Sequence, residues 1–225
     1  MDDTIANRTD LPVSDEEAKA VSVLGKGKII TLAQATAAWP GVEVPVTVPI
    51  RYSVETLQEC ACENRENGTD WRLVYVHGLS LREQRDQIGT NRNHQPCFYN
   101  NDWWLQEKEG EWANFKPEAG YYLIDFNGRF GSTAWKKQEK KIAELGHQFE
   151  RAHETVVAEA ILSVFKTTRE RLLESWYHWG KSLASVGRRV VVGCFDRDGL
   201  SVYSCHPDWD GRGYLRVCLL RKFNA

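Results

Sequence analysis

The sequence of 225 residues lacks several features that would assign it to a well-defined class of protein. No run of 18 apolar residues occurs, which argues against a transmembrane helix. None of the six cysteines forms a C-x-x-C pair, and Cys60 and Cys62 stand too close together for a zinc knuckle. The net charge is only −2, so we expect no general attraction to nucleic acid or to an anionic membrane.

A secretory signal is also missing from the start of the sequence. The first residues read MDDTIANRTDLPVSDEEAK and contain no apolar core. Reduced thiols in the cytoplasm are therefore the default expectation, and association with a virion or a cell surface stays open. The acidic and polar composition predicts that residues 1–24 are disordered or poorly ordered.

Catalytic and metal-binding motifs are incomplete. His153-Glu154 begins a zinc-protease motif, but Val157 stands where the second histidine belongs. Residues 196–199, DRDG, resemble the start of a calcium loop; the later ligands are missing, and Asp-Gly favours a hairpin turn. No set of nucleophile and base stands out. We therefore expect no enzyme, no cofactor and no metal.

The most informative absence lies near the C-terminus. From Ser182 to Arg221 the sequence contains no Lys, Glu, Gln or Met, and between Val190 and Val217 every acidic residue is Asp and every basic residue is Arg. A β-strand bias explains only part of this deficit. Binding surfaces are depleted in Lys and Glu and enriched in Tyr, Trp and Arg, and adaptable combining sites add Ser and Gly. Residues 190–217 are thus predicted to form a contact surface.

Caps and hydrophobic periodicity predict alternating helices and strands before residue 118. Helices are expected over 30–39 after Thr31, from Ser53 to just before Asn67, and over Leu79–Ile88, with a strand over Trp71–His77. Residues 90–118 are rich in aromatic side chains, which predicts an ordered, aromatic-packed loop region with a short helix at 101–108.

From Gly120 onward the pattern predicts the order β-α-α-β-β-β-β. The first strand, 120–126, is expected to end at an Asn127-Gly128 turn, and Ser132 or Thr133 is expected to cap a helix that ends at Gly146. A longer helix is expected over 147–173. The final strands are expected at Trp176–Trp179, Arg189–Phe195, Leu200–Cys205 and Tyr214–Phe223.

The missing residue types also have a genetic explanation, and this explanation points to a resemblance to one protein family. Lys, Glu, Gln and Met cannot be reached from the codon AAC by changing only its adenines, whereas Asp, Arg, Ser, Gly, Tyr and Cys can. This composition, the Trp-rich strand 176–180 and the terminal strand 214–223 together resemble the variable proteins of diversity-generating retroelements. Asn, the unmutated product of AAC, does not occur in residues 190–217.

The resemblance implies a C-type lectin fold of the formylglycine-generating-enzyme type over residues 117–225. This fold is α+β, with two helices and a mixed or antiparallel sheet in which strand 120–126 lies beside strand 214–223. Residues 25–116 would be an N-terminal α+β region that supports the lectin-like domain. The calcium motifs of animal lectins, Glu-Pro-Asn and Trp-Asn-Asp, are absent, so calcium and sugar binding are not carried over.

The resemblance also implies a function, because the adenine-mutated segment of these proteins forms their ligand-binding face. We expect a recognition protein with a macromolecular ligand, taken to be a protein, and with neither nucleic acid nor membrane as partner. Buried scaffold is assigned to Trp176, Trp179, Leu215, Val217 and Leu219. The expected ligand-binding residues are Asp196, Arg197, Asp198, Ser201, Tyr203, Ser204, His206, Asp208, Asp210, Arg212 and Tyr214.

Two alternatives stay open. The related fold hosts a copper-dependent thiol oxidase, for which two of Cys194, Cys205 and Cys218 would supply the thiols. The other alternative is a structural or virion-associated protein without a selected ligand.

Overall fold

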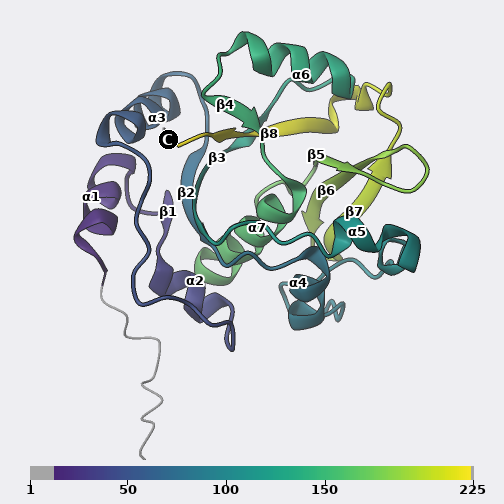
Figure 1. Cartoon of the computed structure of the whole chain (residues 1–225), viewed down its shortest axis with the longest axis horizontal. Coiled ribbons are helices and arrows are strands. Elements are labelled where there is room, and N and C mark those ends of the chain that lie inside the picture. The colour runs from purple at the N-terminus through teal and green to yellow at the C-terminus, as the bar shows by residue number, and fades with distance from the viewer. Residues whose placement is uncertain (1–12, 224–225) are drawn as a thin grey trace, which may run out of the picture.

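The computed structural model describes residues 13–223 and shows an α+β architecture, as the sequence predicts. Within these residues, seven α-helices accompany a mixed sheet of eight strands (Figure 1). The strand order is β1-β2-β3-β8-β5-β6-β7, and β4 pairs with β8 beside this path. The pairs β1–β2 and β5–β8 are parallel and the others are antiparallel.

The N-terminal helices begin where Ser or Thr side chains can cap them. Ser14, Thr31, Ser53 and Ser80 each accept a hydrogen bond from the backbone N–H three residues further on. The predicted helices and the predicted strand of this half are confirmed, with small shifts at their ends. The elements are α1 (Asp15–Leu24), β1 (Ile29–Ile30), α2 (Leu32–Ala38), α3 (Val54–Glu66), β2 (Trp71–Val76) and α4 (Leu81–Ile88).

Helix α1 corrects one expectation. Residues 1–24 were expected to be poorly ordered, but Asp15–Leu24 form a helix with a reciprocal capping box between Ser14 and Glu17. Glu17 is buried and also accepts the backbone N–H of Leu32, which joins α1 to α2. Residues 1–12 lie outside the described part of the chain.

The aromatic segment between α4 and β3 is ordered as expected. It contains two short 3-10 helices, Trp103–Leu105 and Glu107–Glu109, and then α5 (Gly110–Ala113). The ring of Trp112 lies 5.7 Å from that of Trp103 and 6.3 Å from that of Trp104, measured between centroids. These contacts let a segment with little regular structure bury large apolar surfaces.

The C-terminal half contains one strand more than the sequence predicts. Its elements are β3 (Gly120–Arg129), α6 (Trp135–Glu144), β4 (Phe149–Arg151), α7 (Glu154–Thr168), β5 (Tyr177–Leu183), β6 (Arg189–Asp196), β7 (Gly199–Cys205), a 3-10 turn (Gly211–Gly213) and β8 (Leu215–Arg221).

The expected helix 147–173 is wrong at both ends. Phe149–Arg151 form β4, because β8 offers this segment a free edge and Glu150 pairs with Leu220. The helix starts only after His153, whose ring accepts the N–H of Thr155, and stops at Arg169 in a left-handed conformation. Apolar spacing alone could not reveal this boundary, since it continues unbroken from the strand into the helix.

The expected turn at Asn127-Gly128 is also wrong. Strand β3 continues to Arg129, and its register against β8 shifts between Asp125 and Arg129, as at a β-bulge. A Cβ atom on Gly128 would lie 2.6 Å from the Trp176 ring, so glycine serves close packing here. The helix that follows is preceded by Ala134 and has no side-chain cap, so neither Ser132 nor Thr133 caps it.

Strand pairing confirms that the two predicted end strands are neighbours. Leu123 pairs with Arg221, Ile124 with Leu220 and Asp125 with Leu219, all antiparallel. Strand β2 pairs with β3 over its whole length, so residues 29–76 and 120–221 contribute to one continuous sheet.

The predicted scaffold residues are buried, as expected. Trp176, Trp179, Leu215, Val217 and Leu219 are all at most 8% exposed. Helix α7 contacts β2, β5 and β6 and carries twelve buried residues. In Figure 1 it crosses the sheet between the N-terminal and C-terminal strands. No helix within residues 13–223 combines the length and the apolar character needed to cross a bilayer.

Candidate functional site

The predicted contact residues lie along the β6–β7 hairpin and the loop after it. Asp196 and Gly199 close the hairpin tip, and β7 then runs for seven residues to Cys205. Since a strand rises about 3.4 Å per residue, the tip and the loop 206–214 are separated by about 20 Å. The structure therefore places these residues as a tip group (196–198) and a loop group (206–214), with Ser201 and Tyr203 on the strand between them.

Most of the predicted contact side chains are exposed. Tyr203 is 51% and Tyr214 62% exposed, Ser201 is half-buried, and Ser204 is a correction because it is only 8% exposed. Successive strand residues point to opposite faces, and Ser204 shares the inner face with Leu200 and Val202. The exposed members are Asp196, Arg197, Asp198, Tyr203, His206, Asp208, Asp210, Arg212 and Tyr214.

The backbone of the hairpin tip is held by side chains from elsewhere in the chain. Arg171 donates to the carbonyl of Asp196 at 2.6 Å, and Gln95 donates to the carbonyl of Arg197 at 3.0 Å. Arg171 also donates to Gln95 at 3.0 Å, and its guanidinium lies 4.7 Å from the Phe195 ring centroid. The tip is thus fixed from outside through its carbonyl groups, and within the tip only the Asp196 side chain adds a hydrogen bond, from the N–H of Asp198 at 2.8 Å.

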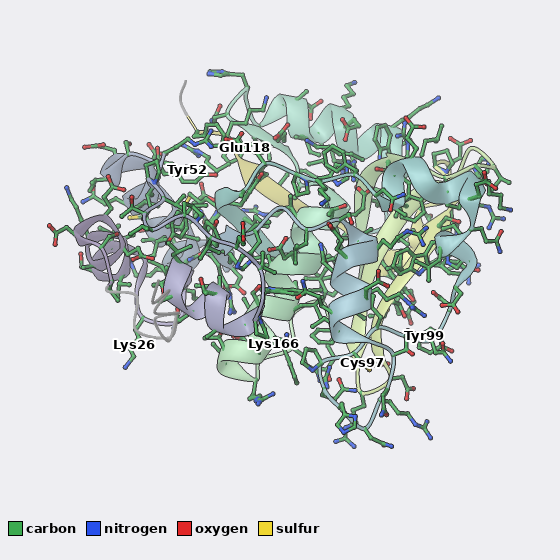
Figure 2. The ribbon with its side chains drawn as sticks, turned by 60° about the horizontal axis from the view of Figure 1, so that its bottom comes forward. Lys26, Tyr52, Cys97, Tyr99, Glu118 and Lys166 are labelled. Carbon is green, nitrogen blue, oxygen red and sulfur yellow. The ribbon has the colours of Figure 1, made fainter. Side chains whose placement is uncertain are left out.

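The outer edge of β7 is covered by the segment 97–103. The N–H of Tyr99 donates to the carbonyl of Leu200, and the N–H of Leu200 donates to the carbonyl of Cys97. The indole N–H of Trp103 donates to the carbonyl of Val202 at 3.0 Å. Figure 2 shows Cys97 and Tyr99 near one another at this side of the molecule. These bonds satisfy an edge that would otherwise remain open to strand addition.

Two adjoining hollows lie between this segment and the hairpin. The first has a volume of about 320 Å³, the second about 550 Å³, and both are lined by Tyr99 and Asp198. The first hollow is also lined by Asn101, Tyr177, Cys194, Asp196, Ser201 and Tyr203. The second is also lined by Thr90, Asn91, Arg92, Asn93 and Asn100.

The contribution of residues 90–101 was not predicted from the sequence. This segment supplies Asn side chains, which residues 190–217 lack, and it adds a further exposed tyrosine ring, Tyr99, to those of Tyr203 and Tyr214. A signal was nevertheless present, because the sequence from Gly89 to Leu105 also contains no Lys, Glu or Met. The same depletion that points to the C-terminal segment points to this loop.

The polar groups at the floor of the first hollow stay neutral at ordinary pH. Burial raises the pKa of Tyr177 to about 12, and the Tyr177 hydroxyl is next to Cys194 and Ser201. Burial also raises the pKa of the Cys194 thiol. Among the other cysteines considered for an oxidase, burial raises the pKa of Cys205 to about 11 and raises that of fully buried Cys218 well above its ordinary value. All three thiols are thus protonated near neutral pH, whereas the thiolate is the reactive form.

At the far end of β7 the loop group packs against α6. The N–H of Trp135 donates to the carbonyl of Pro207 at 2.9 Å, and the guanidinium groups of Arg151 and Arg189 lie 4.8 and 3.9 Å from the Trp135 ring centroid. Trp209 in this loop is 48% exposed. The loop therefore presents an aromatic side chain from an anchored backbone.

The structure does bring one serine, one histidine and one carboxylate together. Ser182 Oγ lies 3.4 Å from His153 Nε2, and Glu154 Oε2 lies 3.6 Å from His153 Nδ1. However, His153 Nδ1 accepts the N–H of Thr155, so it carries no proton to donate to Glu154. A catalytic triad needs that donation to orient the ring, and this set acts instead as a helix cap.

His178 is a core residue. It is fully buried; Nε2 donates to the carbonyl of Ala152 and Nδ1 accepts the N–H of Cys218, both at 3.0 Å. In residues 13–223, no three His, Cys, Asp or Glu side chains gather in a way that could hold a metal ion.

No protein-family model matches this chain, and no curated protein or solved structure matches it either. A fold by itself does not determine function. The function must therefore be argued from the residues of the site.

Proposed function

We propose that the protein is a recognition protein whose tip group, Ser201, Tyr203 and loop group form a diversified binding surface on a C-type-lectin-like scaffold. One observation carries this proposal. The side chains of the hairpin tip are exposed, while its backbone is held by Gln95 and Arg171 from outside the hairpin. Side chains at such positions can be exchanged at little cost in folding free energy, so they are free to serve binding.

Composition supports the same proposal. The exposed residues of this face are Asp, Arg, Tyr, His and Trp, and the loop 90–101 adds Asn and Tyr. Tyrosine supplies contact area at low cost in conformational entropy, and small polar residues supply adaptable hydrogen bonds. The protonated state of Cys194, Cys205 and Cys218 gives no comparable support to the thiol oxidase alternative.

The genetic part of the proposal is tested by sequencing the locus in many individuals of the source population. We expect substitutions at adenine positions of codons for the exposed residues, and a near-copy of the segment nearby that differs only at adenines. Codons for buried Val190, Val192 and Val217 should stay constant. Substitutions spread evenly over the gene would contradict diversification.

The binding part is tested with two displayed libraries of equal size. One library randomises the nine exposed residues of the face, and the control randomises Lys136, Lys137, Lys140, Lys141 and Glu144 on the exposed side of α6. We expect folded binders to unrelated protein targets from the face library at a clearly higher frequency. Equal recovery from both libraries, or widespread unfolding in the face library, would refute the proposal.

A further inference from the structure

The first hollow, lined by Tyr99 and Asp198 among others, has a chemical character that the rest of the face does not share. Three of its lining residues are tyrosines, and none is Lys or Arg. The tyrosines come from separate parts of the chain: Tyr99 from the covering segment, Tyr177 from β5 and Tyr203 from β7. Tyr99 and Tyr203 are 45% and 51% exposed, which leaves ring surface available to a ligand.

Gly193 lies between two of the residues that line the hollow. Gly193 pairs with Tyr177 on one side and with Ser201 on the other. It has no side chain, and a Cβ atom there would lie 2.3 Å from the carbonyl oxygen of Trp176. A larger residue cannot occupy this row, and the register of β6 against β7 shifts directly after it. Strand β6 therefore fixes the spacing between Tyr177 and Ser201, and the Tyr177 hydroxyl lies next to Ser201.

Two carboxylates stand at the rim of the hollow with little charge compensation. Asp196 Oδ1 accepts the N–H of Asp198 at 2.8 Å, and within residues 13–223 Asp196 forms no ion pair. Asp198 approaches Arg92 at 3.9 Å, but both side chains are largely exposed, and such a pair contributes little. Arg197 lies between the two aspartates in the sequence and does not line the hollow.

We propose that this hollow binds a cationic side chain, a guanidinium or an ammonium group, presented by a protein partner. The proposal rests on the proposed recognition function and names what one part of the face recognises. The face of a tyrosine ring attracts a cation through its quadrupole, and the two aspartates add negative charge and hydrogen-bond acceptors. The carboxylates of Asp196 and Asp198 would repel an anionic group.

The test uses the full chain and small probes, so it does not require the partner. The probes are N-acetyl-arginine amide, N-acetyl-lysine amide and, as a neutral control, N-acetyl-leucine amide, each titrated to about 50 mM and followed by the backbone amide signals. We expect the two cationic probes to shift signals of Tyr99, Asn101, Tyr177, Cys194, Ser201 and Tyr203, and the neutral probe to leave them unchanged.

Two double variants make the test specific. Asp196→Asn with Asp198→Asn removes the charge and keeps an oxygen that accepts the N–H of residue 198, so the hairpin turn is preserved. We expect its affinity for the arginine probe to fall by about fivefold. The matched control, Asp208→Asn with Asp210→Asn, makes the same charge change at the far end of β7 and should bind as the parent does.

Three results would overturn the assignment: no shifts with either cation, equal shifts with the leucine probe, or unchanged binding in the Asp196/Asp198 variant. A response to calcium chloride at far lower concentration than to either probe would assign the hollow to a metal instead and would also overturn it. None of these results affects the library test. A failure there, with cations still bound, would refute the recognition face but not the hollow.

Discussion

The proposed face predicts an unusual order of stabilities. In one variant, five exposed residues are replaced by alanine; in the other, only Trp176 is replaced. The five-fold variant carries the substitutions Arg197→Ala, Tyr203→Ala, His206→Ala, Asp208→Ala and Tyr214→Ala. All five side chains are exposed, and Ser204 is left out because it is buried.

The expected magnitudes follow from burial. Each exposed substitution costs within about 0.5 kcal/mol, so the five together cost at most about 2.5 kcal/mol. Trp176 is 8% exposed, its ring packs against Gly128, and its removal costs about 3–5 kcal/mol. For a chain of this size 1 kcal/mol lowers Tm by about 2–4 °C, so Trp176→Ala should lower it by roughly 6–20 °C.

Thermal unfolding of both variants and the parent, followed by circular dichroism at one scan rate, measures this order. We expect the five-fold variant to melt above the Trp176 variant. If the five-fold variant melts lower, the exposed side chains contribute to the folded core. The composition of residues 190–217 would then reflect a structural bias and not a binding surface.

Further predictions concern the tip, the histidines and the thiols. Gln95→Ala combined with Arg171→Ala should speed hydrogen exchange of the amides of 196–199 by about tenfold or more while leaving those of α7 unchanged; no change would show that the tip holds itself. Burial holds the pKa of His178 well below its ordinary value, so the unfolded chain binds a proton that the folded chain does not, and stability should fall as pH drops from about 6.5 to 5, by up to about 1.4 kcal/mol per pH unit. In His178→Gln this dependence should weaken in urea titrations at several pH values, and an unchanged slope would assign it elsewhere. Cys218 should react with a thiol reagent at pH 8 only after denaturation, whereas half-buried Cys62 should react in the folded protein; early reaction of Cys218 would contradict its burial.

Local signals predicted those elements whose ends are determined by local chemistry. Helices α2 and α3 start after Thr31 and Ser53 because those side chains cap backbone N–H groups, whereas the cap of α4, Ser80, lies inside the predicted helix 79–88. Strand β4 could not be found in this way. Its three residues form a strand only because β8, about seventy residues later, provides a pairing partner. Its apolar residue, Phe149, also fits the helical spacing of the apolar residues in α7, so the sequence suggests a helix there.

For the candidate site, the sequence predicted the hairpin tip and its exposed residues but not the loop that packs beside them. The Asp-Gly pair located the hairpin tip, and the polar residues around it are exposed. Ser204 was misplaced because alternation along β7 separates two faces without showing which one is covered. The loop 90–101 reaches the hairpin across about a hundred residues of sequence, through backbone bonds such as that between Tyr99 and Leu200, and no local pattern encodes such a meeting.

The backbone determines which residues of this face can be replaced by others. A Cβ atom on Gly199 would lie 2.7 Å from the carbonyl oxygen of Cys97, and one on Gly193 would meet the carbonyl of Trp176 even closer. These two positions cannot accept a side chain, while their neighbours Asp198 and Ser201 can be replaced without moving the strands. Substitution therefore changes the chemistry of a rigid surface and leaves its shape intact. Under the proposed function, exchange on this face would improve binding mainly through new contacts, because Gln95 and Arg171 already hold the tip in place.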